Sequence, residues 1–307
     1  MTAIAGLHHV TALCADPQAN FDFYTGRMGQ RLVKRTVNFD APDVHHLYYG
    51  DRTGAPGTVM TFFPFPDAAP GRAGDGMARA VAYAASPAGF DAAMDRLARG
   101  AADFDGPAER FGRRVLALSD PDGLTVEIAE TTDGPCDGLH SVTLQLADPA
   151  PTARLLIDVM GFVEHGAETG ADGERLRLRA PGDARGGVVD LLRVPRPASG
   201  RPAIGRSGAG AIHHVAFRAR DAAEQRGWRE RLRAAGFDVT PVTDRRYFNA
   251  IYFREPGGVL FEIATDQPGF TIDEPVETLG QALKLPPVHA PQRARIERVL
   301  PPLDTKP

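Results

Sequence analysis

Two pairs of adjacent histidines stand in nearly the same local sequence, far apart in the chain. The first pair is His8 and His9 in GLHHV, and the second is His213 and His214 in AIHHV. Neutral imidazole is the commonest side-chain ligand for transition metals. Two imidazoles and one carboxylate bind Fe(II) in non-haem oxygenases and leave coordination positions open. The repeated pairs therefore direct attention to metal chemistry and to the search for an acidic partner.

The sequence around these pairs repeats four times. Each copy begins with an alternating apolar stretch, continues with a helical pattern and ends in another apolar stretch, as in GLTVEIAE, GVVDLLRV and GVLFEIATD. Further strand candidates such as VHHLYYGD lie between them, so each unit has the order β-α-β-β-β. We expect an α+β fold in which four βαβββ modules form two cup-shaped mixed β-sheets.

Glycine- and proline-rich stretches set the expected boundaries of the four modules, because such stretches carry no helical or strand periodicity. They lie at residues 66–76, 131–138 and 195–210. The modules are expected over residues 1–66, 77–132, 138–195 and 211–266, followed by a Pro-rich C-terminal tail over residues 267–307.

Overlaying the four units shows which copies keep a potential ligand at equivalent positions. The first-strand position, just before a valine, is occupied in chain order by His9, Ala80, Ser141 and His214. The last-strand position holds no acid in the first unit, and in the others it is occupied by Glu127, Asp190 and Glu262. The two positions recur at nearly constant spacing, so one face of a sheet can bring them together.

The pairing of units decides which of these side chains meet. Units 1 and 4 together supply His9, His214 and Glu262, the set that best suits a transition metal. Units 3 and 4 would replace His9 by Asp190, and units 1 and 2 offer only His9 and Glu127. The sequence leaves these pairings open. A single histidine on a strand is structural more often than not, but two copies at equivalent positions favour a site.

The other histidines and acids are expected to contribute less directly to a metal site. Strict alternation along a strand puts His9 and Thr11 on one face and His8 on the other, so one histidine of each pair ligates easily. A third pair, His45 and His46, lies outside the overlaid positions, and we expect it to pack. Glu127 and Asp190 are interpreted as relics of duplication or as surface acids.

Composition narrows the class of partner. The formal net charge is −4, the pI is about 6.1 and the arginines are scattered among acids, which excludes the basic footprint of a nucleic-acid-binding protein. Two distant cysteines, Cys14 and Cys136, indicate neither a disulfide framework nor a thiolate metal site. The N-terminal residues lack a signal-peptide pattern and no long apolar run occurs, so we expect a cytoplasmic protein with no membrane partner.

The chain resembles the vicinal oxygen chelate superfamily, which includes glyoxalases, bleomycin-resistance proteins and dioxygenases. Within it, the chain is similar to ring-cleaving dioxygenases that act on para-hydroquinones. The resemblance covers nearly the whole chain, including the Pro-rich tail, and rests on GLHHVT, HLYYGD, GTVMTFFPF and DRRYFNAIYFREPGGVLFEIATD. It implies that units 1 and 4 form the metal cup, that His9, His214 and Glu262 bind Fe(II), and that Mn(II) is an occasional substitute.

The resemblance also implies a set of residues around an aromatic substrate, namely His8, Thr11, His213, Arg245 and Tyr252. Arg245, expected near the cup mouth, would hold developing anionic charge, with Arg246 as the local alternative. His8 or His213 would act as acid or base with a pKa close to the working pH. The strand alternation above conflicts with a catalytic place for His8 and His213, unless the strand bends there.

The function expected on these grounds is an Fe(II)-dependent, extradiol-type ring-cleaving dioxygenase that inserts O2 into a hydroquinone- or catechol-type aromatic. Its partners would be a small aromatic substrate and O2, with a homo-oligomer as a possibility. Two other classes stay open. A glyoxalase-type isomerase or thiol transferase usually needs a second carboxylate in the cup, which unit 1 does not provide. A metal-free aromatic-binding resistance protein would have lost the ligands that this chain keeps.

Overall fold

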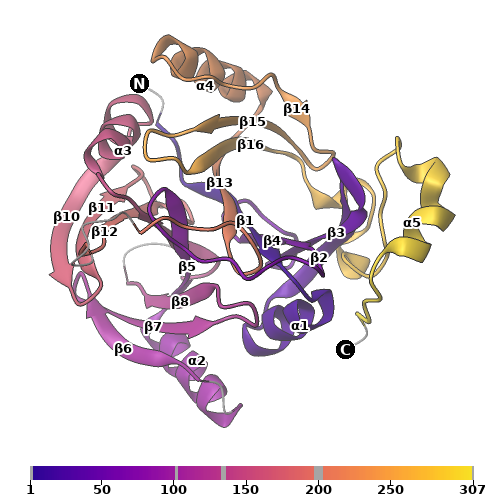
Figure 1. Cartoon of the computed structure of the whole chain (residues 1–307), viewed down its shortest axis with the longest axis horizontal. Helices are drawn as coiled ribbons and strands as arrows, with labels where there is room; N and C mark the ends of the chain where they lie inside the picture. Colours follow the sequence, from indigo (N-terminus) through magenta and orange to yellow (C-terminus); the bar gives the residue numbers. More distant parts are fainter. Residues whose placement is uncertain (1–2, 101–102, 133–135, 197–202, 306–307) are drawn as a thin grey trace.

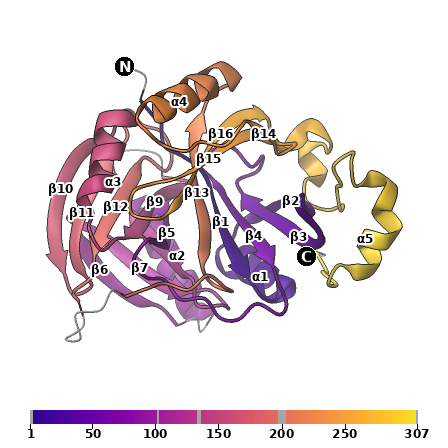
Figure 2. The ribbon, with the colours of Figure 1, turned by 45° about the horizontal axis from the view of Figure 1, so that its top comes forward.

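The strands form two separate curled sheets, each of which encloses its own interior (Figures 1 and 2). The computed structural model describes residues 3–100, 103–132, 136–196 and 203–305, so parts of two expected linkers and the last residues of the tail lie outside the described residues. Each sheet is mixed and eight-stranded. The expected α+β fold with two cup-shaped sheets is confirmed.

The first sheet combines strands from the two ends of the chain, in the order β14-β15-β16-β13-β1-β4-β3-β2. Its members are β1 (Leu7–Cys14), β2 (Arg31–Asn38), β3 (Ala41–Gly50), β4 (Val59–Pro64), β13 (Ile212–Ala219), β14 (Thr243–Asp244), β15 (Phe248–Arg254) and β16 (Leu260–Pro268). Strands β1 and β13 pair antiparallel at the centre, and each pairs in parallel with β4 or β16 on its other side.

The middle of the chain forms the second sheet, in the order β10-β11-β12-β9-β5-β8-β7-β6. Its members are β5 (Met77–Ala85), β6 (Asp105–Arg110), β7 (Arg113–Ser119), β8 (Thr125–Glu130), β9 (Leu139–Gln145), β10 (Val163–Gly170), β11 (Gly173–Arg179) and β12 (Val188–Arg193). Its central strands β5 and β9 are again antiparallel. The two sheets therefore repeat one topology.

Helices lie on the outer side of the sheets. They are α1 (Pro17–Asp22), α2 (Pro87–Arg99), α3 (Ala150–Arg154), α4 (Ala222–Ala234) and α5 (Arg293–Val299), with π-helical turns at Phe23–Arg27 and Leu155–Val159 and 3-10 turns at Phe270–Ile272, Val276–Thr278 and Ala290–Gln292. Helix α4 begins where the Asp221 side chain accepts the backbone N–H groups of Ala223 and Glu224. It buries Trp228 and Leu232 against the sheet.

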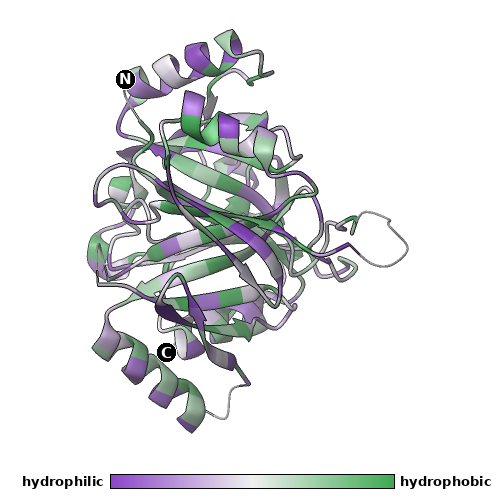
Figure 3. Cartoon of the chain, turned by 90° about the vertical axis from the view of Figure 1, so that its left-hand side faces the viewer, coloured by the Kyte–Doolittle hydropathy of each residue, from purple (hydrophilic) through white to green (hydrophobic). Residues whose placement is uncertain are grey.

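One large apolar cluster joins residues of both sheets to the inner faces of these helices. Apolar residues accordingly concentrate on the strands, whereas the peripheral helices mix polar and apolar residues (Figure 3). Along β1, Val10 and Ala12 enter this core. Since side chains alternate along a strand, His9 and Thr11 face the concave side of the sheet.

Irregular pairing at the centre of the first sheet places the histidine pairs. Along β1 and β13 the register moves from Leu7 opposite Phe217 to His9 opposite Ala216, so His8 is an extra residue. A second shift, from Thr11 opposite His214 to Ala12 opposite Ile212, makes His213 an extra residue on β13. Such β-bulges turn a side chain away from strict alternation, which is the bend that the sequence pattern required.

The tail after β16 packs along β2 and β3, with α5 beyond them at the edge of the molecule (Figure 1). The buried Lys34 ammonium on β2 lies 2.6 Å from the carboxylate of Asp273 and also bonds Glu274. His45 Nε2 is 2.9 Å from the Pro301 carbonyl. Within the described residues, no helix has the length and apolar character needed to cross a membrane.

Candidate metal centre

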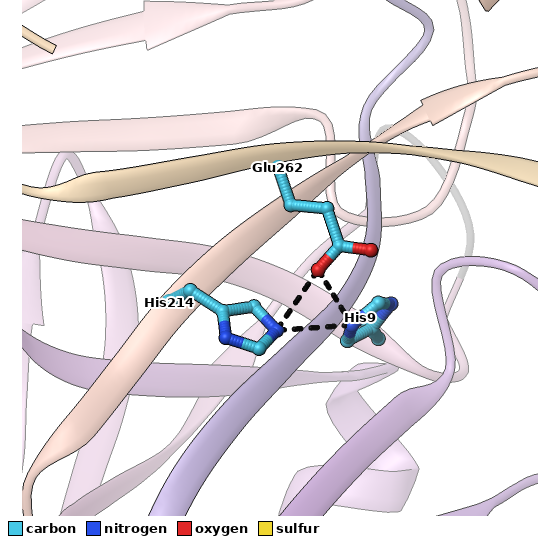
Figure 4. A group of neighbouring side chains, drawn as sticks. All are labelled: His9, His214 and Glu262. Atoms are coloured by element: carbon cyan, nitrogen blue, oxygen red, sulfur yellow. Dashed lines mark hydrogen bonds and ion pairs between the residues drawn. The ribbon is translucent and has the colours of Figure 1, made fainter. Parts of the chain in front are cut away.

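Three side chains from three neighbouring strands converge on the concave face of the first sheet (Figure 4). They are His9 on β1, His214 on β13 and Glu262 on β16. Glu262 Oε2 lies 3.0 Å from His214 Nε2 and 3.5 Å from His9 Nε2, and the two Nε2 atoms are 3.3 Å apart. The register explains the convergence, because Ala216 pairs with both His9 and Glu262 across the sheet.

These three residues are the set that the sequence predicts if units 1 and 4 form one sheet. The structure does not bring together the alternative sets, because Asp190 and Glu127 belong to the second sheet. Among the described residues, the three form the group whose ligand atoms all lie within 4.8 Å of one another.

The carboxylate of Glu262 is the observation that tests whether a metal fits here. Both of its oxygens are buried: Oε2 has ion-pair contacts with the two imidazoles, and Oε1 has no hydrogen-bond partner among the described residues. A buried charged group without hydrogen bonds is costly. A divalent cation between two imidazole nitrogens and Oε2 would satisfy it, and the donor set is that of a two-histidine, one-carboxylate iron site. The residues present therefore fit Fe(II).

The electrostatics of the three residues agree with a cation site. Burial alone would raise the pKa of Glu262, but the neighbouring His9 and His214 outweigh burial and hold that pKa below its usual value. Burial lowers the pKa of His214. An ionised carboxylate and a neutral imidazole are the states in which these groups bind metals.

The outer histidine of each pair bonds the inner one. His8 Nδ1 lies 2.9 Å from His9 Nδ1, and His213 Nδ1 lies 2.7 Å from His214 Nδ1. The ring of His8 also bonds the backbone of Thr265. These contacts point the Nε2 atom of each inner histidine toward Glu262, as outer-sphere partners do around metal-bound histidines.

The expectation that His8 or His213 has a pKa close to the working pH is not met. Burial lowers the pKa of His8 to about 3, with a further contribution from His9. Loss of water around the ring, followed by the charges of His214 and Arg254, lowers the pKa of His213 to about 4. Both rings are therefore neutral near pH 7. The two rings differ in exposure to the cavity beside the three residues: His213 lines its wall, and His8 does not.

A cavity of about 370 Å³ opens from the three convergent residues. Its wall is mainly aromatic, and the side chains beyond the metal-ligand candidates are Leu13, Asn38, Phe39, Asp40, His46, Tyr48, Phe63, Phe65, His213, Arg245, Phe248 and Tyr252. The ring of Phe248 packs against that of His9 in a tilted arrangement, with the centroids 5.0 Å apart. Such a wall is shaped for a flat apolar ring with a few polar substituents.

Arg245 and Tyr252 meet at this cavity, as the resemblance implied. Arg245 Nε donates to the Tyr252 hydroxyl at 3.1 Å, and burial raises the pKa of that hydroxyl. Arg246 has φ 68° and does not line the cavity. Thr11 is also outside the wall, and its Oγ1 bonds Thr61 Oγ1 at 2.9 Å.

His46 corrects the expectation that the third histidine pair only packs. His45 does face the tail, but His46 lines the cavity, where its Nε2 bonds Thr61 Oγ1 at 2.9 Å and its Nδ1 bonds the Tyr48 hydroxyl at 2.8 Å. Alternation along β3 puts His46 and Tyr48 on one face, a signal in VHHLYYGD that could have identified both residues.

The second sheet also has a cavity, of about 310 Å³ and lined by His140 and Arg177, but the acids at the equivalent position are paired with arginines. Glu127 is paired with Arg110 through two bonds of 2.7 and 3.0 Å, and Asp190 with Arg177 through two bonds of 2.8 Å. Both acids are buried, so the expectation of surface acids is wrong. Arginine occupies the place beside each acid that a metal would need.

Comparison with known proteins adds to this geometry. The sequence profile of the Glyoxalase/Bleomycin resistance protein/Dioxygenase superfamily matches residues 6–128 and 138–263. MhqO of Bacillus subtilis, provisionally named a ring-cleaving dioxygenase, is 42% identical over 98% of this chain and 97% of its own. The chlorohydroquinone/hydroquinone 1,2-dioxygenase of Sphingobium indicum is 34% identical over 92% of this chain and 92% of its own.

A solved structure extends the likeness to the whole fold. The crystal structure of a Bacillus subtilis protein provisionally named a dioxygenase has a TM-score of 0.91 and 40% identity, and it covers 100% of this chain and 99% of its own. These relatives support a dioxygenase activity. The resemblance found in the sequence motifs is confirmed, and the chain belongs to the glyoxalase/bleomycin resistance protein/dioxygenase superfamily.

Proposed function

We propose that this protein is an Fe(II)-dependent, extradiol-type ring-cleaving dioxygenase that inserts O2 into a hydroquinone- or catechol-type aromatic. One observation carries the proposal. Two imidazole nitrogens and an unsatisfied carboxylate face a cavity whose wall is mainly aromatic. Such a triad leaves room for an oxygen of the substrate and for O2. The names of the relatives point to the same class of reaction.

His9 Nε2, His214 Nε2 and Glu262 Oε2 are the atoms proposed to hold the metal, with Mn(II) as a substitute for Fe(II). Bound Fe(II) supplies the redox chemistry that lets O2 react with an aromatic ring. His8 and His213 then act as positioning residues, because each holds the Nδ1 side of a ligand ring and so fixes the direction of its Nε2.

The remaining wall residues bind and orient the ring. Phe63 and Phe248 exclude water from the space beside the centre and favour a planar apolar substrate. Because Tyr252 accepts a hydrogen bond from Arg245, its own O–H proton is available to the cavity. Tyr252 would donate this proton in a hydrogen bond to an oxygen of the reacting ring, and Arg245 would stabilise the negative charge that develops there.

Proton movement and product follow from the same geometry. A substrate hydroxyl would lose its proton when its oxygen binds at the centre, because a bound cation would lower the pKa of that hydroxyl. His213 would then donate its Nε2–H toward the cavity, because its Nδ1 accepts the Nδ1–H of a His214 that binds metal through Nε2. Insertion of both oxygen atoms beside a hydroxyl-bearing carbon breaks one ring bond. The product is a ring-opened, muconate-type acid or semialdehyde.

The glyoxalase-type alternative is less well supported by the side chains present. It needs a second carboxylate at the centre, and β4 carries Thr61 there, opposite Thr11 in the register. Among the described residues that line the cavity, the acids are Glu262 and, at its mouth, Asp40. A metal-free binding function would leave the two inner histidines and the unsatisfied carboxylate without a role.

The test is anaerobic reconstitution with Fe(II), followed by oxygen-electrode recording when 2-methylhydroquinone and then catechol are added. We expect O2 uptake in proportion to substrate loss, and loss of both in His9→Ala and Glu262→Ala. The control variant is His165→Ala, which removes an exposed histidine from β10 in the second sheet.

Two outcomes would contradict the proposal. One is metal-loaded protein that consumes no O2 with either phenol. The other is O2 uptake that survives in both ligand variants, because the reaction would then occur away from this centre.

A further inference from the structure

An ion pair spans the mouth of the aromatic cavity. Arg245 Nη1 lies 2.9 Å from Asp40 Oδ2. Asp40 stands in the turn between β2 and β3, and Arg245 directly follows β14, so the two residues come from the opposite edges of the eight-stranded sheet. These edges approach each other at one side of the molecule (Figure 1). The pair therefore closes the open side of the curled sheet over the cavity.

The contact holds the arginine in one orientation. Arg245 Nε donates to Tyr252, and its Nη1 donates to Asp40. Its backbone N–H also bonds the Phe248 carbonyl. The Asp40 side chain is 75% exposed and the Arg245 side chain 24% exposed, so the carboxylate reaches the guanidinium from the solvent side. Asp40 thereby keeps Arg245 against Tyr252.

The same contact changes the charge that a substrate meets. Arg245 is the one lysine or arginine among the described residues that line the cavity. Its guanidinium is the group to which a carboxylate on the substrate ring would bind. Because Asp40 already neutralises it, an anionic ring substituent would gain little from Arg245 and would be repelled by Asp40. An uncharged ring substituent meets no such penalty beside the phenyl groups of the wall.

We propose that Asp40 is a specificity-determining and positioning residue that selects uncharged aromatic rings over rings that carry a carboxylate. It does so by pairing with Arg245 at the cavity mouth. This inference rests on the proposed function for its choice of aromatic ring, but not on turnover, because the discrimination is a property of binding.

The test compares an anionic and an uncharged form of one ring, (2,5-dihydroxyphenyl)acetate and its methyl ester, which differ in charge and by one methyl group. Their dissociation constants are measured by anaerobic calorimetry on the full-length, Fe(II)-loaded protein. The wild type should bind the ester more tightly than the acid. Removing a partly solvated like charge at the mouth should narrow this ratio about five-fold in Asp40→Asn. Asp40→Glu, which keeps the charge, should restore most of the ratio.

The matched control is Asp43→Asn, which removes an exposed carboxylate only three positions along the same hairpin and outside the cavity wall. It should leave the ratio unchanged, and thermal unfolding should show that both variants fold like the wild type. Equal binding of acid and ester by the wild type, or the same change in both asparagine variants, would overturn the inference.

Oxygen consumption separates this inference from the proposed function. If Asp40→Asn loses the preference for the ester and the wild type consumes no O2, the inference is supported and the proposed function is contradicted. Ester-dependent O2 uptake with an unchanged binding ratio in Asp40→Asn contradicts the inference alone. Absence of binding by both ligands would overturn the inference alone, because O2 uptake with 2-methylhydroquinone or catechol decides the proposed function.

Discussion

The buried carboxylate of Glu262 should make the protein less stable without metal than it is with metal. In the structure both carboxylate oxygens are buried, and Oε1 has no hydrogen bond in the described part of the chain. An unsatisfied buried polar group costs about 1–3 kcal/mol, and more if it is charged. The two imidazoles together hold the pKa of the carboxyl below its usual value, but burial lowers the pKa of His214, and its neutral ring near pH 7 offsets only part of the cost. We therefore expect Glu262→Gln to leave the free energy of unfolding of the metal-free protein unchanged or to raise it by about 1 kcal/mol.

Metal should reverse the order of stability. A ligand present at about 100 times its dissociation constant adds about 2.7 kcal/mol to the free energy of unfolding when it binds only the folded state. The wild type should gain this amount with Fe(II) under anaerobic conditions. Glu262→Gln should gain much less, because it loses the anionic ligand. Urea denaturation with chelator and with Fe(II), for both proteins, gives the four free energies needed.

The repeat supplies a matched control in Glu127→Gln. Glu127 occupies the equivalent position in the second sheet, where it makes two charge-assisted bonds with Arg110. Its substitution should destabilise the protein by a few kcal/mol with or without metal, because Arg110 is left without its partner. Our reasoning would be refuted if Glu262→Gln destabilised the metal-free protein as much as Glu127→Gln does. It would also be refuted if Fe(II) stabilised the wild type and Glu262→Gln equally.

Three further predictions concern other residues. His8→Ala should weaken Fe(II) binding about 10- to 100-fold by releasing the Nδ1 side of His9, as measured by competition with a coloured chelator; an unchanged affinity would show that His8 only packs. Arg177→Met should lower the free energy of unfolding by about 1–3 kcal/mol, because the fully buried Asp190 loses two charge-assisted bonds and keeps its 3.3 Å contact with Arg175, while the KM for hydroquinone, measured by O2 uptake, stays the same. Burial raises the pKa of Asp120 from 3.8 to about 6 in the folded protein. Between these two values the folded state binds more protons than the unfolded state. The contribution of Asp120 to stability therefore falls as pH rises from about 4 to about 6. Asp120→Asn should flatten that slope in urea denaturation across this pH range, and an unaltered slope would contradict the assignment.

The order of elements was readable from the sequence because it depends on local properties. Alternating apolar residues, Gly- and Pro-rich breaks and the fourfold recurrence predict strands and helices without knowledge of their partners. The overlay of repeats likewise gives a short set of candidate ligands, in which His9, His214 and Glu262 best suit a transition metal, although the overlay leaves the pairing of units open. Equivalent positions in equivalent modules must lie on equivalent faces.

The surroundings of the site were only partly readable. The resemblance implies Arg245 and Tyr252, whereas the sequence predicts only packing for His46 and does not distinguish Asp40 from other loop acids. Both lie on the β2–β3 hairpin, whose place over the cavity depends on how the sheet curls. The sequence predicts that Glu127 and Asp190 are relics of duplication or surface acids, because nothing in their own strands shows that Arg110 and Arg177 from neighbouring strands pair with them.

By itself, the sequence determined the repeated unit, the residue types that can bind a metal and the strand face on which each lies, since these depend on spacing along the chain. Only the tertiary structure decided that the two ends of the chain share a sheet and that bulges turn His8 and His213 toward the ligand histidines. It also decided that Glu262 faces two histidines, whereas Glu127 and Asp190 are paired with arginines. These outcomes depend on contacts between residues far apart in the chain. Several similar strands could pair with one another, and no local sequence pattern specifies which of them do.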